Sequence, residues 1–229
     1  MIYVQQSWTI MPGKEEEYDR LARKESVEVF SRHTDVKVVG AWQSFFNDNI
    51  IISVLALIDF NAIQRFWTDP IYRDFRAKLL RLVSDYHYQI LTTTGRVDRF
   101  LSKGGGEIFL YQSYDILPKS VDEYVNLVRT EVSQIFESHV APRLIGAWQS
   151  IFSPTHVVSV LAFDDFASLQ IYSDAQFVKE FTEKSLRLVT NHHSDILVTT
   201  GRVDVFKPCP PTDHSPRTRP SESPPIAFM

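Results

Sequence analysis

The pentapeptide Gly40-Ala41-Trp42-Gln43-Ser44 occurs twice in this chain, and its second copy is Gly146-Ala147-Trp148-Gln149-Ser150, 106 residues later. The hexapeptide Thr93-Thr94-Gly95-Arg96-Val97-Asp98 returns at the same offset as Thr199-Thr200-Gly201-Arg202-Val203-Asp204. When residues 2–100 are aligned with residues 108–206 without a gap, 41 of 99 positions are identical. Chance would give roughly one identity in sixteen positions at an ordinary composition. The chain is therefore a tandem duplication.

The duplication predicts the domain organisation. Two repeats, 1–100 and 107–206, are joined by a Gly-rich linker at 101–106 that has no hydrophobic pattern. Each repeat is large enough for a small core of its own. Residues 207–229 hold seven of the chain's 12 prolines and lack apolar periodicity, so a disordered tail is predicted there. A Pro-rich ligand for a partner domain is the alternative interpretation of this tail.

Composition excludes several classes of protein. The 229 residues carry 24 Lys and Arg against 28 Asp and Glu, a net charge of −4, which gives no support to a nucleic-acid surface. A single cysteine, Cys209, rules out an intramolecular disulfide framework and a multi-cysteine metal site. No secretory leader is visible, and no apolar run approaches the roughly 20 residues that a membrane helix needs. We therefore expect a cytoplasmic protein without a membrane or nucleic-acid partner.

Hydrophobic periodicity predicts the elements of each repeat. Alternation indicates strands, and a spacing of three to four residues indicates helices. In the first repeat these are strands at 2–10, 36–46, 50–58 and 90–94, and helices at 14–30 and 63–86, the second broken near Asp69-Pro70. The order βαββαβ is that of a ferredoxin-like unit. Its sheet has helices on one face only, so the bare face needs a partner, which the second repeat can supply.

Several short stretches resemble the NIPSNAP family. They are Gly40 to Phe46, Ile51 to Leu55, and Asp69-Pro70 followed by Phe75 and Lys78, with a fitting Pro12-Gly13-Lys14 start. That family belongs to the dimeric α+β barrel superfamily, and the resemblance covers nearly all of residues 2–206. It implies an α+β fold in which two tandem ferredoxin-like repeats pack sheet to sheet as a dimeric α+β barrel-type pseudo-dimer. Exchange of halves between two chains, giving a homodimer, is the alternative.

Strand alternation divides the central hairpin into two faces. Ala41, Gln43 and Ser53 share one face, whereas Trp42 and Ile52 share the other. The family's pattern implies that the first of these faces lines the barrel. The predicted lumen then contains Gln6, Trp8, Gln43 and Ser53 from one half, with Gln112, Tyr114, Gln149 and Ser159 from the other. Such a lumen is either an amphipathic pocket for a ring compound or a filled interface in which each glutamine satisfies another.

Titratable candidates are few. Where the third strand of the family often has a histidine, this chain has Ser53 and Ser159, so Tyr114 is the only titratable group of the predicted lumen. His33 and His139 follow the first helix of each repeat. They are interpreted either as proton acceptors at the barrel mouth or as histidines that stabilise a helix C-terminus. His87 and His193 are assigned to the end of the second helix, where the second interpretation applies.

The last candidates are a repeated arginine–aspartate pair and the known cofactor motifs. Arg96 and Asp98, repeated as Arg202 and Asp204, form either an ion pair between halves or a site for an anionic substrate. No metal-ligand spacing, P-loop or dinucleotide-binding fingerprint is present, so no metal and no cofactor are expected.

The predicted function is a NIPSNAP-like, cofactor-free enzyme that binds an aromatic or polyketide-like substrate. It would promote cyclisation, isomerisation or oxygenation in specialised metabolism. His33, His139 and Tyr114 would be catalytic, and the glutamines, serines and Trp8 would bind substrate. The alternative is a non-catalytic ligand-binding or scaffold protein.

Overall fold

The structure is a computed structural model that describes residues 1–102 and 105–200. The first half consists of β1 (Ile2–Ile10), α1 (Glu15–Ser31), β2 (Val36–Ser44), β3 (Ile50–Leu57), α2 (Phe60–Thr68), α3 (Pro70–Leu79) and β4 (Val83–Thr93). After a 3₁₀ turn, η1 (Asp98–Phe100), the second half consists of β5 (Ile108–Ile116), η2 (Pro118–Ser120), α4 (Val121–Phe136), β6 (Arg143–Ser150), β7 (His156–Phe163), α5 (Phe166–Asp174), α6 (Gln176–Leu186) and β8 (Val189–Thr199). The predicted tail and part of the predicted linker lie outside the described residues.

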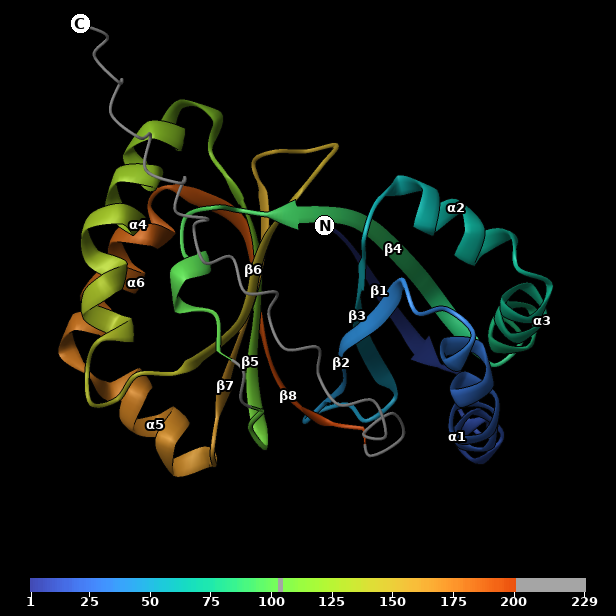
Figure 1. Ribbon diagram of the computed structural model, residues 1–229. Coiled ribbons are helices and arrows are strands. Elements are labelled where there is room, and N and C mark those ends of the chain that lie inside the picture. The colour runs from blue at the N-terminus through green and yellow to red at the C-terminus, as the bar shows by residue number, and fades with distance from the viewer. Residues whose placement is uncertain (103–104, 201–229) are drawn as a thin grey trace, which may run out of the picture.

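The strands close into one antiparallel barrel in the order β1-β3-β2-β8-β5-β7-β6-β4. The last strand of each half joins the other half, because β4 pairs with β6 and β8 pairs with β2. Helices α1–α3 cover one side of the barrel and α4–α6 cover the opposite side (Figure 1). The predicted α+β fold of two ferredoxin-like units packed sheet to sheet is confirmed, and the barrel closes within a single chain.

The interior of the barrel is packed with large apolar side chains from both halves. Trp42 lies against Phe109, with ring centroids 5.5 Å apart, and Tyr3 lies against Trp148 at the same distance, related by the repeat. Ile52, Val54 and their counterparts Val158 and Val160 belong to the same buried cluster. Polar groups that enter the barrel are paired with each other: Gln5 donates to the Tyr111 hydroxyl at 2.9 Å and accepts from Gln89 at 2.8 Å. The lumen is thus a filled core.

The duplicated pentapeptide has a steric explanation. A Cβ on Gly40 would lie 2.0 Å from Cζ2 of Trp42, and one on Gly146 would lie 2.0 Å from Cζ2 of Trp148. Each indole ring therefore lies over a glycine of its own strand. The pairing register shifts between Val38 and Gly40, and again between Leu144 and Gly146. Before this bulge, Val38 faces the helices. After it, the odd-numbered residues, such as Ala41, face the helices instead of the even-numbered ones.

One predicted element is wrong. The second helix of the first half ends at Leu79, not at residue 86, and β4 begins at Val83, seven residues before the predicted strand. Leu79, Val83 and Tyr86 fit a helical spacing, but Val83 pairs with Ile10 and His87 pairs with Ser7 in the sheet. Asp85 has φ +50°, and its counterpart Asn191 has φ +51°, which places an irregularity in β4 and β8 where strand alternation is interrupted. His87 and His193 are consequently strand residues.

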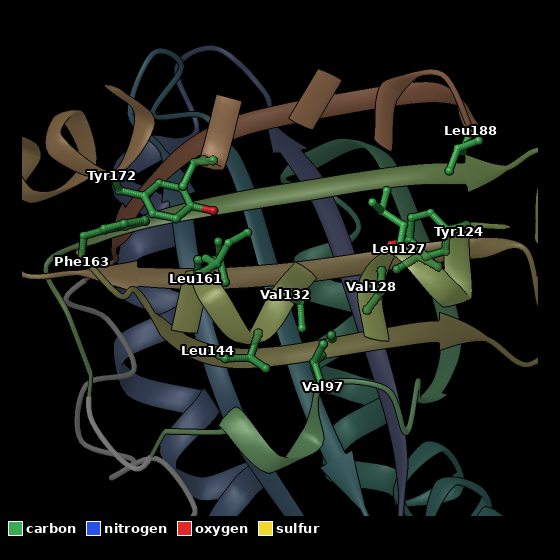
Figure 2. Packing of buried hydrophobic residues seen from close by; sticks show 14 of the residues in the cluster. Val97, Tyr124, Leu127, Val128, Val132, Leu144, Leu161, Phe163, Tyr172 and Leu188 are labelled. Atoms are coloured by element: carbon green, nitrogen blue, oxygen red, sulfur yellow. The ribbon is translucent and has the colours of Figure 1, made fainter. Parts of the chain in front are cut away.

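The helices bury their apolar faces on the outer surface of the barrel. In the second half, Val128 and Val132 of α4 lie over Leu144 of β6 and Leu161 of β7 (Figure 2). In the first half, Asp69 separates α2 from α3 and caps α3 by accepting hydrogen bonds from the backbone N–H groups of Ile71 and Tyr72. Within residues 1–102 and 105–200, no helix has the length and apolar composition required to cross a membrane.

Candidate functional site

Two cavities lie between the barrel and its helices, one in each half. The second-half cavity measures about 130 Å³, and its polar lining includes Arg96, Gln112, Tyr114, Tyr124, Ser159 and His192. The first-half cavity measures about 70 Å³, and its polar lining includes Gln6, Trp8, Tyr18, Ser53, Tyr72 and Tyr86. The remaining walls are mainly apolar side chains of the helix–sheet interface.

These positions correct the predicted lumen. The sequence reasoning grouped the right residues on one face, but that face contacts the helices, and the opposite face, with Trp42 and Ile52, fills the barrel. Both faces of the sheet are apolar, so alternation alone does not reveal which face meets the other half. Gln6, Trp8 and Ser53 line the first-half cavity, whereas Gln112, Tyr114 and Ser159 line the second-half cavity.

Arg96 reaches the second-half cavity from the first half of the chain. After β4, the backbone N–H of Thr94 donates to the carbonyl of Ala147 at 3.1 Å, so the connection follows β6. The Arg96 guanidinium lies 5.9 Å from the centre of the Tyr124 ring, and its Nη2 donates to Oε1 of Gln149 at 3.5 Å. Its Nη1 is buried and has no hydrogen-bond partner among the described residues. A buried cationic N–H group without a partner is energetically costly, which favours an oxygen acceptor from a ligand at this point.

Two tyrosines form the floor beside Arg96. The hydroxyls of Tyr114 on β5 and Tyr124 on α4 are hydrogen-bonded to each other. Burial raises the pKa of Tyr114 well above its ordinary value and also raises the pKa of Tyr124, while the positive charge of Arg96 opposes both shifts. Both hydroxyls are therefore protonated at neutral pH. One hydrogen bond uses only one of their two protons, so the pair keeps one O–H to donate to a ligand.

His192 is the titratable group that the sequence reasoning missed. It lies on β8, is exposed at the edge of the second-half cavity, and stacks on Tyr114 with ring centroids 6.3 Å apart and an interplanar angle of 22°. Its neighbour His193 points to the other face of β8, where its ring lies edge-on to Tyr111 of the barrel core, with ring centroids 6.2 Å apart. Recognising residues 189–199 as a strand would have separated the two histidines, because neighbouring side chains on a strand point to opposite faces.

The first-half cavity has diverged from its counterpart. Trp8 and Tyr86 occupy the positions of Tyr114 and His192, and their rings stack with centroids 6.1 Å apart. Gln6 donates to the Tyr86 hydroxyl at 2.8 Å and lies 3.4 Å from the Tyr72 hydroxyl. Gln6 and the two tyrosine hydroxyls are hydrogen-bonded, whereas the buried Nε1 of Trp8 has no hydrogen-bond partner among the described residues. The first-half cavity is smaller and has no histidine in its described lining, and Arg202, the repeat counterpart of Arg96, lies outside the described residues.

The other predicted site residues line neither cavity, although Gln149 accepts the hydrogen bond from Arg96. Gln43 and Gln149 lie at the seams between the halves, opposite Val198 and Thr92. His33 lies with Nε2 3.3 Å from Oδ2 of Asp69 and its ring edge-on to Phe66. His139 is exposed just after α4. Neither histidine lines a cavity, so the structure does not bring them together with the remaining candidates.

Metal-ligating residues are scattered in the described part of the chain. Across residues 1–102 and 105–200, no three His, Cys, Asp or Glu side chains are grouped so that they could hold a metal ion. The polar groups of the second-half cavity are donors of the amide, hydroxyl, imidazole and guanidinium type. That set suits an oxygen-bearing organic ligand rather than a cation.

Comparisons with known proteins identify the fold. No protein-family model and no curated protein matches this chain. A candidate monooxygenase from Fusobacterium nucleatum aligns with 86% of this chain and 91% of its own, at 11% identity and a TM-score of 0.68. A candidate monooxygenase from Lactobacillus acidophilus aligns with 86% of this chain and 92% of its own, at 12% identity and a TM-score of 0.64. An anthrone oxidase-like protein aligns with 86% of this chain and 90% of its own, at 9% identity and a TM-score of 0.57.

Single-repeat proteins also match. A NIPSNAP domain protein from Burkholderia xenovorans aligns with 40% of this chain and 93% of its own, at 16% identity and a TM-score of 0.35. The three neighbours that superpose on 86% of the chain show the dimeric α+β barrel fold, and at 9–12% identity they show the fold alone.

Proposed function

We propose that this protein is a small-molecule enzyme whose second-half cavity binds a planar, weakly acidic ring compound of aromatic or polyketide type and moves a proton on it. The observation that carries the proposal is the partnerless Nη1 of Arg96, held beside a protonated tyrosine pair in a cavity whose remaining walls are mainly apolar. We also propose that each half is related to the NIPSNAP proteins that it resembles.

The cavity sets the size and chemistry of the ligand. An apolar cavity of about 150 Å³ holds a benzene ring, and the second-half cavity, at about 130 Å³, is close to that size, so a single ring is the largest group that it can enclose. Further rings would extend past His192 toward solvent. A ring oxygen that becomes negative, such as an enolate or a phenolate, would accept hydrogen bonds from Arg96 and from the free O–H of the tyrosine pair. The anthrone oxidase-like neighbour supports a ketone or phenol of this kind.

The proton step uses His192. Its neutral imidazole would take a proton from the carbon next to the ring carbonyl, leaving an enolate and an imidazolium. Arg96 would stabilise the negative oxygen of that enolate, as fixed donors do in oxyanion sites. Reprotonation of the enolate at another carbon would give isomerisation. Attack of the enolate carbon on a second carbonyl of the same substrate would give cyclisation. Addition of molecular oxygen to the same carbanion would give oxygenation, which the two candidate monooxygenases support.

The experiment uses two probes and a matched control. 2-Tetralone has an acidic C–H next to its carbonyl, and 2-naphthol imitates its enol. We expect the protein to accelerate exchange of that C–H for deuterium, measured by NMR, and 2-naphthol to inhibit it. His192→Asn should abolish the acceleration without weakening 2-naphthol binding, whereas His193→Asn, on the opposite face of β8, should change neither. Arg96→Leu should weaken 2-naphthol binding by about tenfold or more.

The outcomes also separate the alternative function. Binding of 2-naphthol that depends on Arg96 but brings no exchange would favour a non-catalytic ligand-binding protein. Binding that is unchanged in Arg96→Leu, with the protein still folded, would contradict the proposed site altogether.

A further inference from the structure

The first half carries a second pocket on its outer surface. This outer pocket measures about 260 Å³ and is lined by Trp67, Arg73, Arg76, Leu80, Tyr86 and Tyr88, among others. It lies between the end of α2, the exposed side of α3 and the strand β4. Arg76 and Tyr86 also line the first-half cavity, so they form the wall between the two spaces.

Aromatic rings form one side of the outer pocket. Trp67 and Tyr88 meet edge to face, with ring centroids 5.3 Å apart and an interplanar angle of 79°. Tyr88 is 52% exposed and Leu80 is 41% exposed. Large side chains with this much contact to water are favourable places for a flat apolar ligand to bury its surface.

Two guanidinium groups form the other side. Arg73 and Arg76 are one helical turn apart on α3, so they project from the same face. The Arg76 guanidinium lies 5.5 Å from the centre of the Tyr86 ring. Neither arginine forms an ion pair within the described residues, and the nearby Asp74 is paired with Lys78 at 2.8 Å. Two guanidiniums without a carboxylate partner, of which Arg76 also hydrogen-bonds the Tyr86 side chain, make a suitable anchor for a carboxylate.

The second half provides an internal comparison. Trp67, Arg73, Arg76 and Tyr88 correspond to Ser173, Lys179, Thr182 and Ser194. Lys179 is paired with Asp174 at 3.2 Å, so no free cation replaces Arg73. The half-buried phenylalanine of α3 is shared by the two halves, since Phe75 and Phe181 are equivalent and each packs against the core of its own half. The second half therefore folds without the aromatic and cationic set, although Trp67 also packs partly against the first-half core.

We propose that the outer pocket is a second, non-catalytic ligand site for a flat aromatic carboxylate. The ring lies against Trp67 and Tyr88, and the carboxylate accepts hydrogen bonds from Arg73 and Arg76. This site does not depend on the function proposed for the second-half cavity, because the two share no residue. The tandem chain then has two chemically different sites, one in each half.

The test uses 2-naphthoate as the probe and 2-naphthalenemethanol as its neutral analogue. Binding is measured by calorimetry and by quenching of tryptophan fluorescence, since Trp67 is the one tryptophan outside the buried core of the described chain. We expect 2-naphthoate to bind at least about tenfold more tightly than the alcohol and to weaken as salt is raised. Arg73→Ser with Arg76→Thr should weaken binding by about tenfold or more, and Trp67→Ser should remove the quenching.

Two control variants assign the binding to this pocket. Lys179→Ser changes the position equivalent to Arg73, and Arg96→Leu changes the second-half cavity; in both variants the binding of 2-naphthoate that depends on Arg73 and Arg76 should persist. Circular dichroism confirms that each variant is folded. The proposal is overturned if 2-naphthoate does not bind, if the alcohol binds equally well, or if only Arg96→Leu abolishes binding. The last result would leave the function proposed for the second-half cavity intact.

Discussion

Replacing Gly40 with alanine should destabilise the barrel by a clash with a single side chain. The added Cβ would lie 2.0 Å from Cζ2 and 2.4 Å from Cη2 of Trp42, whereas ordinary contacts begin at 3.4 Å. Trp42 is only 2% exposed and is held against Phe109, so its ring has little room to withdraw. Overpacking of this kind costs about 1–3 kcal/mol. The lower backbone entropy of alanine in the unfolded chain offsets about 0.5–1 kcal/mol of that cost.

The expected net loss in the free energy of unfolding is about 1 kcal/mol, with an upper limit of about 2.5 kcal/mol, measured by urea denaturation followed by far-ultraviolet circular dichroism. Gly146→Ala should cost a similar amount, because its Cβ would meet Trp148 at the same 2.0 Å. Gly40 is not among the residues with positive φ, so the backbone itself tolerates alanine there. The steric account therefore predicts that the cost disappears when the indole is removed.

The decisive comparison is made in a Trp42→Ala background. There Gly40→Ala should be neutral or stabilise the protein by up to about 0.5–1 kcal/mol, through the entropy difference alone. An equal loss in both backgrounds would show that the indole ring is not the reason for the glycine. An unchanged free energy of unfolding in Gly40→Ala itself would refute the packing described for this motif.

Two further predictions concern a missing cap and a pH-dependent contact. Ala175 precedes α6 with φ −62° and ψ 128°, nearly the angles of the capping residue Asp69 at φ −60° and ψ 127°, but it provides no side-chain cap. Ala175→Asp should raise the free energy of unfolding by about 1 kcal/mol in urea denaturation. The side-chain hydrogen bond from Asn191, followed by that from His156, lowers the pKa of Asp115. Asp115→Asn should therefore lower the urea midpoint at pH 7, and the loss should shrink as the pH falls through the lowered pKa of the carboxylate.

Each of these predictions has a clear contrary result. An Ala175→Asp variant that is no more stable than the original would mean that α6 gains nothing from a cap. If Asp115→Asn lowered stability equally at pH 7 and pH 2, the contribution would not come from the ionised carboxylate. Replacement of Asp48 by asparagine in the first hairpin is a suitable control, because Asp48 has no ion pair or side-chain hydrogen bond in the described chain and should show no such pH dependence.

Much of the fold was predictable because its signals are local. The 106-residue offset, the amphipathic helices and the alternation of residues 36–44 can all be identified in the sequence without any tertiary contact. The boundary between α3 and β4 was not predictable in this way. Leu79, Val83 and Tyr86 fit a helical spacing. Residues from Val83 onward form a strand only because they pair with β1, with an irregularity at Asp85.

The candidate site was predictable only in part. Gln112, Tyr114 and Ser159 were selected correctly as neighbours on one face, because their positions follow from strand alternation. His192 was missed because the strand that carries it was mistaken for a helix. For Arg96, the sequence left an ion pair and an anion site as alternatives, because its surroundings depend on how the connection after β4 runs along β6.

The sequence by itself determined that this chain is internally repeated, and which side chains share a face along the first strand and along the central hairpin beyond Gly40. Only the tertiary structure decided which face meets the helices and which meets the other half. The physical reason is that both faces are buried, so both are apolar, and the choice between them depends on fit. The indoles of Trp42 and Trp148 fill the closed barrel, and the face that carries Tyr114 is left to the helices, where a cavity remains.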